Sequence, residues 1–378
     1  MARTPRSTRG RPAGRKAAAT PVGRSSPSPA ADGPPSPTRE AGKRSETARP
    51  STTRRIVLTG AAGFIGGAVA RVLRERGDAV VALVRDRRRA ANVDELGVEI
   101  VEDDLAEIDR LADAFRGADA VIHAAGMYRI GIPRAARGAM WDANVGTTTR
   151  VLDAAEDAGT PRIVHVSTVN VFGNTHGRVV DESYRRDLAE GFVSWYDETK
   201  YGAHEVAEQR IRDGAPIVIA MPSQVYGPRD HSEIGERLRA AYDGSLRYAA
   251  LDDVGFGLVH VHDLADGVVA ALDRGQAGRP YVLSGPTTTL RDATAIAARI
   301  GGRTPPALRV PTAALSLIAP LGSIIGRPNL REVIAASAGV TYWASSGRAR
   351  EELGWEPRDI ETGLRDTFGL AARSAGSP

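Results

Sequence analysis

A tyrosine and a lysine four residues apart, in Tyr196-Asp-Glu-Thr-Lys200, are suited to exchanging a proton with a carbonyl or an alcohol. On a helix this spacing places both side chains on one face. Free tyrosine has a pKa near 10, so exchange near pH 7 requires that pKa to fall by roughly 3 units, or about 4 kcal/mol. A lysine ammonium one helical turn away, together with a further positive charge bound beside it, can lower the tyrosine pKa by stabilising the tyrosinate. We therefore predict Tyr196 as a general acid/base tuned by Lys200.

Two hydroxyl residues, Ser167 and Thr168, follow the apolar run 162–166. A hydroxyl at the end of a strand can donate a hydrogen bond to a substrate carbonyl oxygen. Strand-end hydroxyls are common, so this pair gains meaning only in combination with Tyr196 and Lys200.

Three glycines at three-residue intervals, Gly60, Gly63 and Gly66, follow the branched apolar run 56–58 and precede the Ala-rich stretch 67–76. This pattern predicts a strand, a tight turn and the start of a helix. Such a turn lays backbone N–H groups and the positive end of the helix against a pyrophosphate. A glycine triplet alone is weak, but here both flanking elements are present. We predict a dinucleotide-binding turn.

The end of the second predicted strand bears on which dinucleotide binds. A fold specific for NAD usually places an acid there, to hold the ribose 2′-hydroxyl. In this chain Val84 occupies that place and Arg85 follows it. An arginine can pair with a 2′-phosphate, which favours NADP(H). Asp86 lies one residue later and keeps NAD(H) open.

Apolar strands and helical stretches alternate from residue 54 onward, which predicts an α/β fold with a Rossmann-type, doubly wound parallel sheet. We expect an NAD(P)-binding domain over 54–230 and a smaller, interleaved substrate-binding region over 231–378. The further expected strands are 79–84, 98–101, 120–123, 162–166 and 216–220, and the clearest helices are 105–115, 144–158 and 196–213.

The formal net charge of +4 conceals an asymmetry. Residues 1–53 carry 11 Lys/Arg and 3 Asp/Glu, whereas the rest carries 39 and 43, so the body is mildly acidic. This basic tail, rich in Pro, Ser and Arg, is expected to be disordered, because it cannot bury enough apolar surface to offset its ordering entropy. Contact of the tail with nucleic acid or an anionic membrane stays open, but a solvated extension is favoured. Deleting it is expected to leave catalysis unchanged.

The chain has no cysteine, which excludes disulfides, thiolate metal sites and Cys nucleophiles. We assign no metal, and the composition fits a cytoplasmic location. No segment reaches the ~18 uninterrupted apolar residues of a transmembrane helix. The nearest, 313–325, contains Pro320 and is expected to be a buried or pocket-lining helix.

Taken together, these motifs resemble the extended short-chain dehydrogenase/reductase family, also called the NAD-dependent epimerase/dehydratase family. The resemblance covers about residues 54–370. Beyond the glycines, it rests on Asp104-Leu105, His123-Ala-Ala125-Gly126, Asn144-Val-Gly-Thr147, Tyr196 with Lys200, Pro222-Ser-Gln-Val-Tyr226, His260-Val-His-Asp263 and Glu351-Glu-Leu-Gly354-Trp355. It implies Thr168, Asn144, Tyr196 and Lys200 as catalytic residues. It implies cofactor contacts from Gly60, Gly63, Phe64, Ile65, Gly66, Arg85, Asp104, Leu105, Ala124, Ala125, Tyr196, Lys200, Pro222 and Val225. Asp104 can equally be only a helix cap.

The Val84-Arg85 ending and the stretch Ala124-Ala-Gly-Met-Tyr128-Arg129 are similar to the subgroup of dihydroflavonol reductases, 3β-hydroxysteroid dehydrogenases and hopanoid-associated epimerase-like proteins. Phe256 stands where nucleotide-sugar epimerases usually carry an arginine. The expected substrate contacts are Met127, Tyr128, Thr168, Trp195, Gln224 and Tyr226, and the lengthened segment 174–195 is expected to line the same pocket. The family often forms homodimers, which the sequence does not decide.

The resemblance and the residues together predict an oxidoreductase that moves a hydride between NADP(H) and a small, fairly apolar carbonyl or alcohol. A sugar or nucleotide-sugar epimerase or dehydratase using NAD is the alternative enzyme. A non-catalytic module that senses NADP(H) is the alternative of another class, and the presence of both Tyr196 and Lys200 weighs against it.

Overall fold

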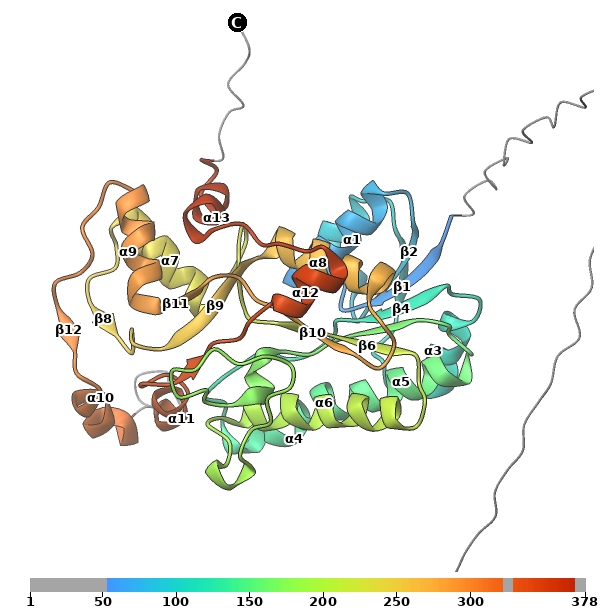
Figure 1. Cartoon of the computed structure of the whole chain (residues 1–378), viewed down its shortest axis with the longest axis horizontal. Helices are drawn as coiled ribbons and strands as arrows, with labels where there is room; N and C mark the ends of the chain where they lie inside the picture. The colour runs from blue at the N-terminus through green and yellow to red at the C-terminus, as the bar shows by residue number, and fades with distance from the viewer. Residues whose placement is uncertain (1–52, 322–328, 371–378) are drawn as a thin grey trace, which may run out of the picture. The chain divides into compact units, whose positions relative to one another are not determined.

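A seven-stranded, all-parallel sheet forms the centre of the computed structural model, which describes residues 53–321 and 329–370 (Figure 1). All but the last residue of the basic tail lies outside the described residues. The strand order is β10-β6-β5-β4-β1-β2-β3, so the order reverses between β1 and β4. The predicted doubly wound Rossmann-type sheet is confirmed. Its strands are β1 (Arg55–Thr59), β2 (Ala79–Val84), β3 (Glu99–Glu102), β4 (Ala120–His123), β5 (Ile163–Val166), β6 (Ile217–Pro222) and β10 (Pro280–Leu283).

Helices cover both faces of this sheet because alternate side chains of each strand point to opposite faces. In β1, Ile56 and Leu58 pack into one cluster of buried residues and Val57 packs into the other. The first cluster includes residues of α1 (Phe64–Glu75), α8 (Val261–Arg274) and α12 (Gly347–Leu353). The second includes residues of α3 (Ile108–Phe115), α5 (Thr147–Asp157) and α6 (Trp195–Arg212), the helices along the lower side of the sheet in Figure 1.

The predicted elements agree with the structure to within three residues at their ends, and two of the differences have a physical cause. The helix expected from residue 105 begins at Ile108, because Leu105 has a φ of +63° and its N–H donates to Asp103 Oδ1 at 2.7 Å. The helix expected over 144–158 begins as a π-helical turn, Asp142–Gly146, before α5. Such turns are rare and occur often at functional sites.

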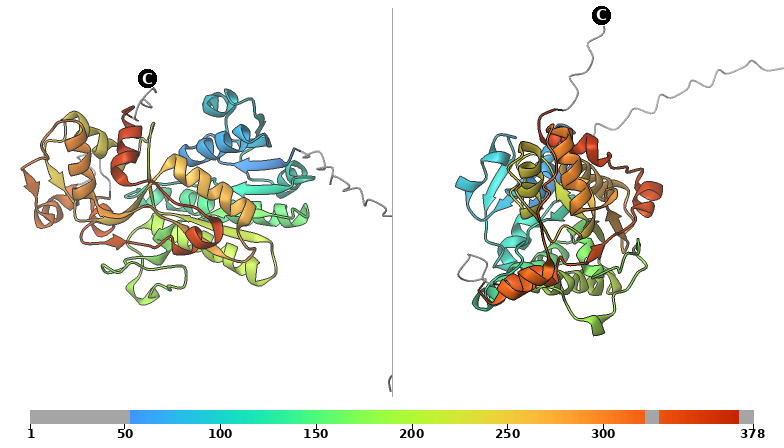
Figure 2. Two further views of the ribbon diagram at one scale, coloured as in Figure 1. Left: turned by 45° about the horizontal axis from the view of Figure 1, so that its top comes forward. Right: turned by 90° about the vertical axis from the view of Figure 1, so that its left-hand side faces the viewer.

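The C-terminal half is interleaved with the sheet rather than separate from it. It supplies β10 and α8 to the central layers, and β9 (Gly255–His260) pairs with β7 (Gln224–Tyr226) from the other half. The remaining strands are β8 (Ala249–Ala250), β11 (Thr287–Thr289), β12 (Arg309–Val310) and β13 (Thr341–Tyr342). The remaining helices are α2 (Ala91–Asp94), α4 (Arg137–Trp141), α7 (Glu233–Asp243), α9 (Leu290–Ile300), α10 (Thr312–Ile318), α11 (Leu330–Ala335) and α13 (Ile360–Thr367). Figure 2 shows α7 and α9 side by side beyond the end of the sheet.

The expectation of a buried or pocket-lining helix over 313–325 is wrong for its described part. Helix α10 has no buried residue, and Leu317 is 82% exposed. The apolar side chains of α10 are therefore not buried, because α10 lies at the edge of the fold (Figure 1). Residues 322–325 lie outside the described residues. No described helix is long and apolar enough to cross a lipid bilayer.

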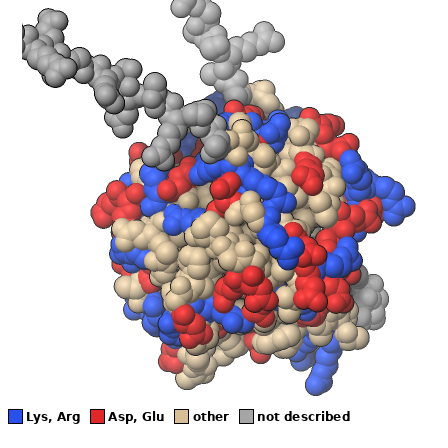
Figure 3. All heavy atoms as spheres, turned by 90° about the vertical axis from the view of Figure 1, so that its right-hand side faces the viewer, with Lys and Arg blue, Asp and Glu red and all other residues tan. Residues whose placement is uncertain are grey.

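Charged side chains of both signs are interspersed with uncharged ones on the face shown in Figure 3. No one-sided basic stripe is visible among the described residues of this face (Figure 3).

Candidate active site

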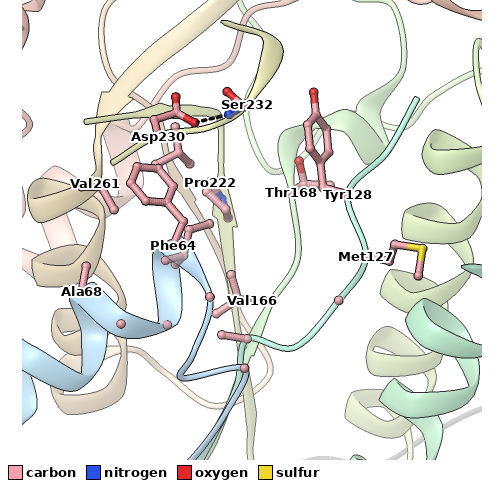
Figure 4. A pocket seen from close by; sticks show the side chains of 18 of the residues that line it. Phe64, Ala68, Met127, Tyr128, Val166, Thr168, Pro222, Asp230, Ser232 and Val261 are labelled. Atoms are coloured by element: carbon pink, nitrogen blue, oxygen red, sulfur yellow. Dashed lines mark hydrogen bonds between the residues drawn. The ribbon is translucent and has the colours of Figure 1, made fainter. Parts of the chain in front are cut away.

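A cavity of about 880 Å³ opens at the carboxyl edge of the sheet, where the strand order reverses between β1 and β4. This is the edge at which open α/β sheets bind ligands, and the volume suits a cofactor with a small substrate. Figure 4 shows Phe64 and Ala68 of α1 on one side and Met127 and Tyr128 on the other. Thr168 lies between these two walls (Figure 4).

The glycine turn forms one wall of the cavity and has the geometry that a dinucleotide requires. Gly60 has a φ of +75°, and a Cβ there would lie 2.6 Å from the backbone nitrogen of Ala125. A Cβ on Gly66 would lie 2.2 Å from the carbonyl oxygen of Gly60, so the start of α1 can pack on the turn only as glycine. Gly63 is the N-cap of α1 and offers no capping side chain, which leaves the first backbone N–H groups available for a pyrophosphate. The residues present therefore fit a dinucleotide.

Helix α6 carries the predicted catalytic pair into the cavity. The Ser194 hydroxyl caps the helix by accepting from the Asp197 N–H at 3.0 Å. Asp197 forms a buried ion pair with Arg186, with Nη1 and Oδ1 2.9 Å apart, which fixes the first turn. Tyr196 and Lys200 both line the cavity, and Lys200 Nζ donates to the Val166 carbonyl at 3.4 Å.

The protein by itself raises the pKa of Tyr196. Burial is the largest cause, the neighbouring Tyr128 and Asp197 add to it, and a hydrogen bond with Thr168 acts in the opposite direction. The expectation that Lys200 and a bound positive charge together lower this pKa is not tested by the protein alone, in which desolvation is the largest cause. Tyr196 is thus protonated at neutral pH, which is the form that can donate a proton.

Lys200 occupies an unusual place in the composition of the chain. Only three lysines occur, Lys16, Lys43 and Lys200, among 50 Lys/Arg residues. Burial lowers the pKa of Lys200 to about 8. An amine can shift its pKa in this way, whereas a guanidinium stays charged. The single lysine beyond residue 43 is a sequence signal that the spacing argument did not use.

Thr168 and Tyr128 face Tyr196 across the cavity. The Thr168 hydroxyl donates to Asn170 Oδ1 at 3.0 Å, which orients it. The rings of Tyr128 and Tyr196 meet edge to face, with centroids 4.8 Å apart. Tyr128 is 52% exposed. Both signs of charge line this part of the cavity, from Asp230 and Glu233 and from Arg129 and Arg229.

Asn144, predicted as catalytic, acts in this structure on the loop that follows β4. Its Oδ1 accepts from the Met127 N–H at 2.7 Å, and its Nδ2 donates to the Met127 carbonyl at 3.1 Å and to Thr199 Oγ1 at 2.8 Å. Both ends of the amide are engaged, so Asn144 holds Met127 against α6.

Several predicted site residues lie away from the cavity. Tyr226 is 1% exposed and its hydroxyl points to the Ile360 carbonyl, and Trp195 Nε1 donates to the Arg137 carbonyl at 2.9 Å. Their predicted contact with substrate is corrected, because each ring packs into the protein. Segment 174–195 supplies none of the described lining residues, since Thr175 and Val180 hydrogen-bond to strand residues Thr341 and Trp343 instead.

Three predicted cofactor residues also lie outside the cavity wall. Arg85 is exposed beyond the end of β2, and Leu105 is buried. The Asp104 carboxylate accepts from the Ala106 N–H at 3.1 Å, which is the capping role considered as its alternative. The other predicted contacts do line the cavity: Gly60, Gly63, Phe64, Ile65, Gly66, Ala124, Ala125, Met127, Tyr128, Thr168, Pro222, Gln224 and Val225.

Sequence reasoning missed Arg71, Asn92 and the segment 228–233, all of which line the cavity. Arg71 lies two turns into α1 from Phe64, so helical spacing from the glycine turn could have identified it. The segment 228–233 left no comparable signal, because Arg229 takes a left-handed φ of +65° that its residue type does not announce.

Outside the cavity, His260, His262 and Asp366 bring three potential metal ligands within 4.8 Å of one another. Arg358 Nη1 donates to Asp366 Oδ2 at 2.9 Å, and Arg358 also pairs with Asp263. The guanidinium already neutralises these carboxylates, so the cluster is an ion-pair network at the start of α8.

A family model described as the NAD dependent epimerase/dehydratase family matches residues 56–284, more than half of the chain. The chain belongs to this family. It is an extended short-chain dehydrogenase/reductase and an oxidoreductase enzyme.

Relatives of known name span the same region. A 2-alkyl-3-oxoalkanoate reductase of Stenotrophomonas maltophilia is 29% identical over 82% of this chain and 97% of that protein. A farnesyl-dihydroquinoline-oxide ketoreductase of Stigmatella aurantiaca is 28% identical over 80% of this chain and 92% of that protein.

Solved structures agree with the sequence comparisons. The crystal structure of gox2253 is 32% identical, with a TM-score of 0.72 over 84% of this chain and 98% of that chain. A double mutant of the dTDP-glucose 4,6-dehydratase DesIV from Streptomyces venezuelae, with NAD and DAU bound, is 26% identical, with a TM-score of 0.68 over 85% of this chain and 98% of that chain.

Proposed function

We propose that this family member is an NADP(H)-dependent carbonyl reductase, working also in reverse as an alcohol dehydrogenase, on a small and fairly apolar substrate. The observation that carries the proposal is the protonated Tyr196, buried beside Thr168 and Lys200 in the cavity next to the glycine turn. A protonated phenol suits a step in which a carbonyl oxygen gains a proton.

The residues divide the reaction between them. The Thr168 hydroxyl turns its O–H from Asn170 to the substrate oxygen, and Tyr196 gives its proton to that oxygen as the carbonyl is reduced. Lys200 lies one turn away and stabilises the tyrosinate that results. A nicotinamide dinucleotide held by the glycine turn supplies or accepts the hydride. Met127 and Tyr128 cover the apolar part of the substrate.

Two arginines support the phosphorylated cofactor. Arg71 and Arg85 form no salt bridge to any carboxylate of the described chain, so both are available to a 2′-phosphate. The names of two relatives, a ketoreductase and a 3-oxoalkanoate reductase, support the reduction of a ketone.

The alternative is an NAD-dependent sugar epimerase or dehydratase, which the likeness to the dTDP-glucose dehydratase with NAD bound supports. Native mass spectrometry of freshly purified protein separates the two. NADP(H) at partial occupancy supports the reductase, because a reductase exchanges its cofactor in every cycle. Stoichiometric, firmly held NAD supports the epimerase and contradicts our proposal.

Replacing Tyr196 with Phe tests the role of the hydroxyl. Y196F is expected to reduce ketone turnover by at least roughly a hundredfold. The dissociation constant for NADP(H), measured by fluorescence, is expected to stay within about twofold, because a phenyl ring keeps the packing on Tyr128. The matched control is Tyr201→Phe, which alters a tyrosine on the same helix that does not line the cavity. Near-normal turnover in Y196F would overturn the mechanism.

A further inference from the structure

Four titratable residues repeat at every fourth position of α6: Tyr196, Lys200, His204 and Glu208. Residues four apart share a helix face, so this series runs as one stripe from the cavity toward the end of the helix. Tyr196 and Lys200 line the cavity, while His204 is 6% exposed and belongs to the same helix one turn further on. The proposed reaction uses only the first two members.

The other two members connect to the cavity through Ser167. The Ser167 hydroxyl and His204 Nδ1 form a buried hydrogen bond of 2.9 Å. His204 Nε2 lies 3.4 Å from Glu208 Oε1, and the Glu208 side chain is 23% exposed. A proton can therefore pass between Ser167 and His204 and between His204 and Glu208.

The two ends of this connection open into different spaces. Ser167 lines the active-site cavity, whereas His204 and Glu208 line a separate, smaller hollow together with Tyr184 and Arg185. Lys200 Nζ donates to the carbonyl of Val166, the residue immediately before Ser167. The remaining gap between Lys200 and Ser167 lies within the cavity, where a water can bridge two polar groups.

Carbonyl reduction consumes one proton from solvent in each turnover, and Tyr196 is only 8% exposed even before ligands fill the cavity. Asn144, which the family resemblance implies as a catalytic residue, has its side-chain amide engaged by Met127 and Thr199. We propose that Ser167, His204 and Glu208 form a proton relay that connects the catalytic Tyr196–Lys200 pair with solvent on the far side of α6. This inference rests on the proposed reductase function.

The relay moves protons and no electrons. After Tyr196 has protonated the substrate oxygen, Lys200 returns a proton to the tyrosinate, and Ser167 passes its hydroxyl proton to Lys200 through the cavity water. In the form of the His204 ring that carries its proton on Nδ1, Nδ1 gives that proton to Ser167 and Nε2 takes one from Glu208, which is refilled from solvent. The ring returns to this form before the next turnover. Alcohol oxidation runs the same sequence backward. The pKa of Glu208 is held below its usual range, chiefly by the hydrogen bond with His204 and further by the cations of Arg185 and Arg212. Glu208 therefore rests as a carboxylate and carries a solvent proton only transiently.

The simpler interpretation is that His204 only provides a hydrogen-bond partner for the buried hydroxyl of Ser167. His204→Gln distinguishes the two readings, because glutamine keeps a hydrogen-bonding group beside Ser167 but does not exchange protons. Glu208→Gln interrupts the relay at its solvent end without touching the cavity. Glu205→Gln is the matched control, since Glu205 lines the same hollow but contacts Tyr201 rather than His204.

The kinetic test uses NADPH and a short 2-alkyl-3-oxo ester as the probe ketone. H204Q and E208Q are expected to lower kcat by roughly ten- to hundredfold, with KM and the NADPH dissociation constant within about twofold. The solvent deuterium isotope effect on kcat should rise in both, and a small diffusible acid such as imidazole should restore part of the rate. E205Q should match the unaltered protein.

Hydrogen exchange of the His204 ring tests the proton relay without requiring enzyme turnover. In protein with ¹⁵N-labelled histidine, exchange of the His204 ring N–H with solvent should be fast and should slow in E208Q. The ring N–H groups of His123 and His165, buried away from both spaces, serve as slow references.

The outcomes separate the relay from the reaction. If H204Q and E208Q keep normal kcat and isotope effects while the unaltered protein reduces the ketone, the relay is wrong. A loss of kcat with an unchanged isotope effect and no rescue also overturns it, because only structure was then disturbed. If the unaltered protein reduces no ketone yet His204 exchanges fast, the reductase function fails and the connection to solvent stands.

Discussion

The side chain of Asn144 bridges both polar groups of Met127, accepting from its N–H at 2.7 Å and donating to its carbonyl at 3.1 Å. The pairing joins the π-helical turn before α5 to the loop that follows β4. Because that loop also carries Tyr128, one amide sets the position of the wall opposite the glycine turn.

Replacing Asn144 with Asp is therefore expected to loosen the substrate wall. Aspartate keeps the acceptor for Met127 N–H but places a second acceptor against the Met127 carbonyl and Thr199, which costs about 1–3 kcal/mol. We expect a lower melting temperature and a higher KM for ketone. The control Thr199→Val removes one bond to the amide and should cost less. Unchanged melting temperature and KM in N144D would contradict this role.

Replacing Lys200 with Met is expected to stabilise the cofactor-free protein while abolishing activity. The pKa of Lys200 is about 8 in the folded protein against an ordinary 10.5, so holding the cation in the cavity costs about 1–3 kcal/mol at pH 7 once cavity water is allowed for. The unfolded state binds more protons between pH 8 and 10.5, so the stability of the unaltered protein rises over that window. K200M should lack this rise.

Urea unfolding at pH 7, 8, 9 and 10 measures the Lys200 effect. Lys200→Arg is the matched control, because a guanidinium keeps its charge and should bring no stabilisation. Equal or lower stability of K200M at pH 7 would show that the buried ammonium costs nothing.

Replacing His165 with Leu is expected to stabilise the protein in acid. Both ring nitrogens of His165 are buried without a hydrogen-bond partner in the described structure, and the ring stacks on His123 with centroids 5.4 Å apart. Burial holds the pKa of His165 well below its usual value, with help from His123, Lys200 and His204. Stability is therefore lost as pH falls below about 6.5, where the unfolded histidine takes up a proton.

Thermal unfolding from pH 4 to 8 tests this expectation. H165L should be more stable by about 1–3 kcal/mol at neutral pH and should show a shallower acid slope. The control His176→Gln changes an exposed histidine beside Glu190 and should leave the slope as it is. An unaltered slope in H165L would assign acid sensitivity to other groups, of which His123, with a pKa of about 3, is the first to examine.

Charge reversal at Arg85 and at Arg71 tests the cofactor preference. Arg85 was expected to hold the 2′-phosphate, whereas Arg71 is the arginine of α1 that lines the cavity. A lost charge-assisted hydrogen bond should weaken NADP(H) binding roughly ten- to a hundredfold and leave NAD(H) binding nearly unchanged. Arg89→Glu, on the same exposed turn as Arg85, controls for net charge. NADP(H) affinity that survives both R85E and R71E would remove the basis for the preference.

Local sequence patterns were sufficient to predict the backbone elements that form the site. Strand, turn and helix signals around Gly60, Gly63 and Gly66 predicted a geometry in which backbone contacts require glycine at Gly60 and Gly66. Likewise, the spacing of Tyr196 and Lys200 predicted that both reach one cavity. These predictions succeed because period and backbone freedom are properties of short segments.

The directions of Trp195 and Tyr226 could not be derived in the same way. Both neighbour residues that line the cavity, yet each ring turns inward to partners more than 50 residues away, at Arg137 and Ile360. Segment 174–195 likewise packs on residues 341–344, which no local signal connects with it.

The sequence by itself determined the parallel α/β fold, the dinucleotide turn and the Tyr196–Lys200 pair, because these depend on neighbouring residues. Only the tertiary structure decided that burial raises the pKa of Tyr196, that Asn144 clamps Met127, and that Ser167 meets His204. The physical reason is that desolvation and hydrogen-bond partners arise from residues distant in the chain, which packing alone brings together.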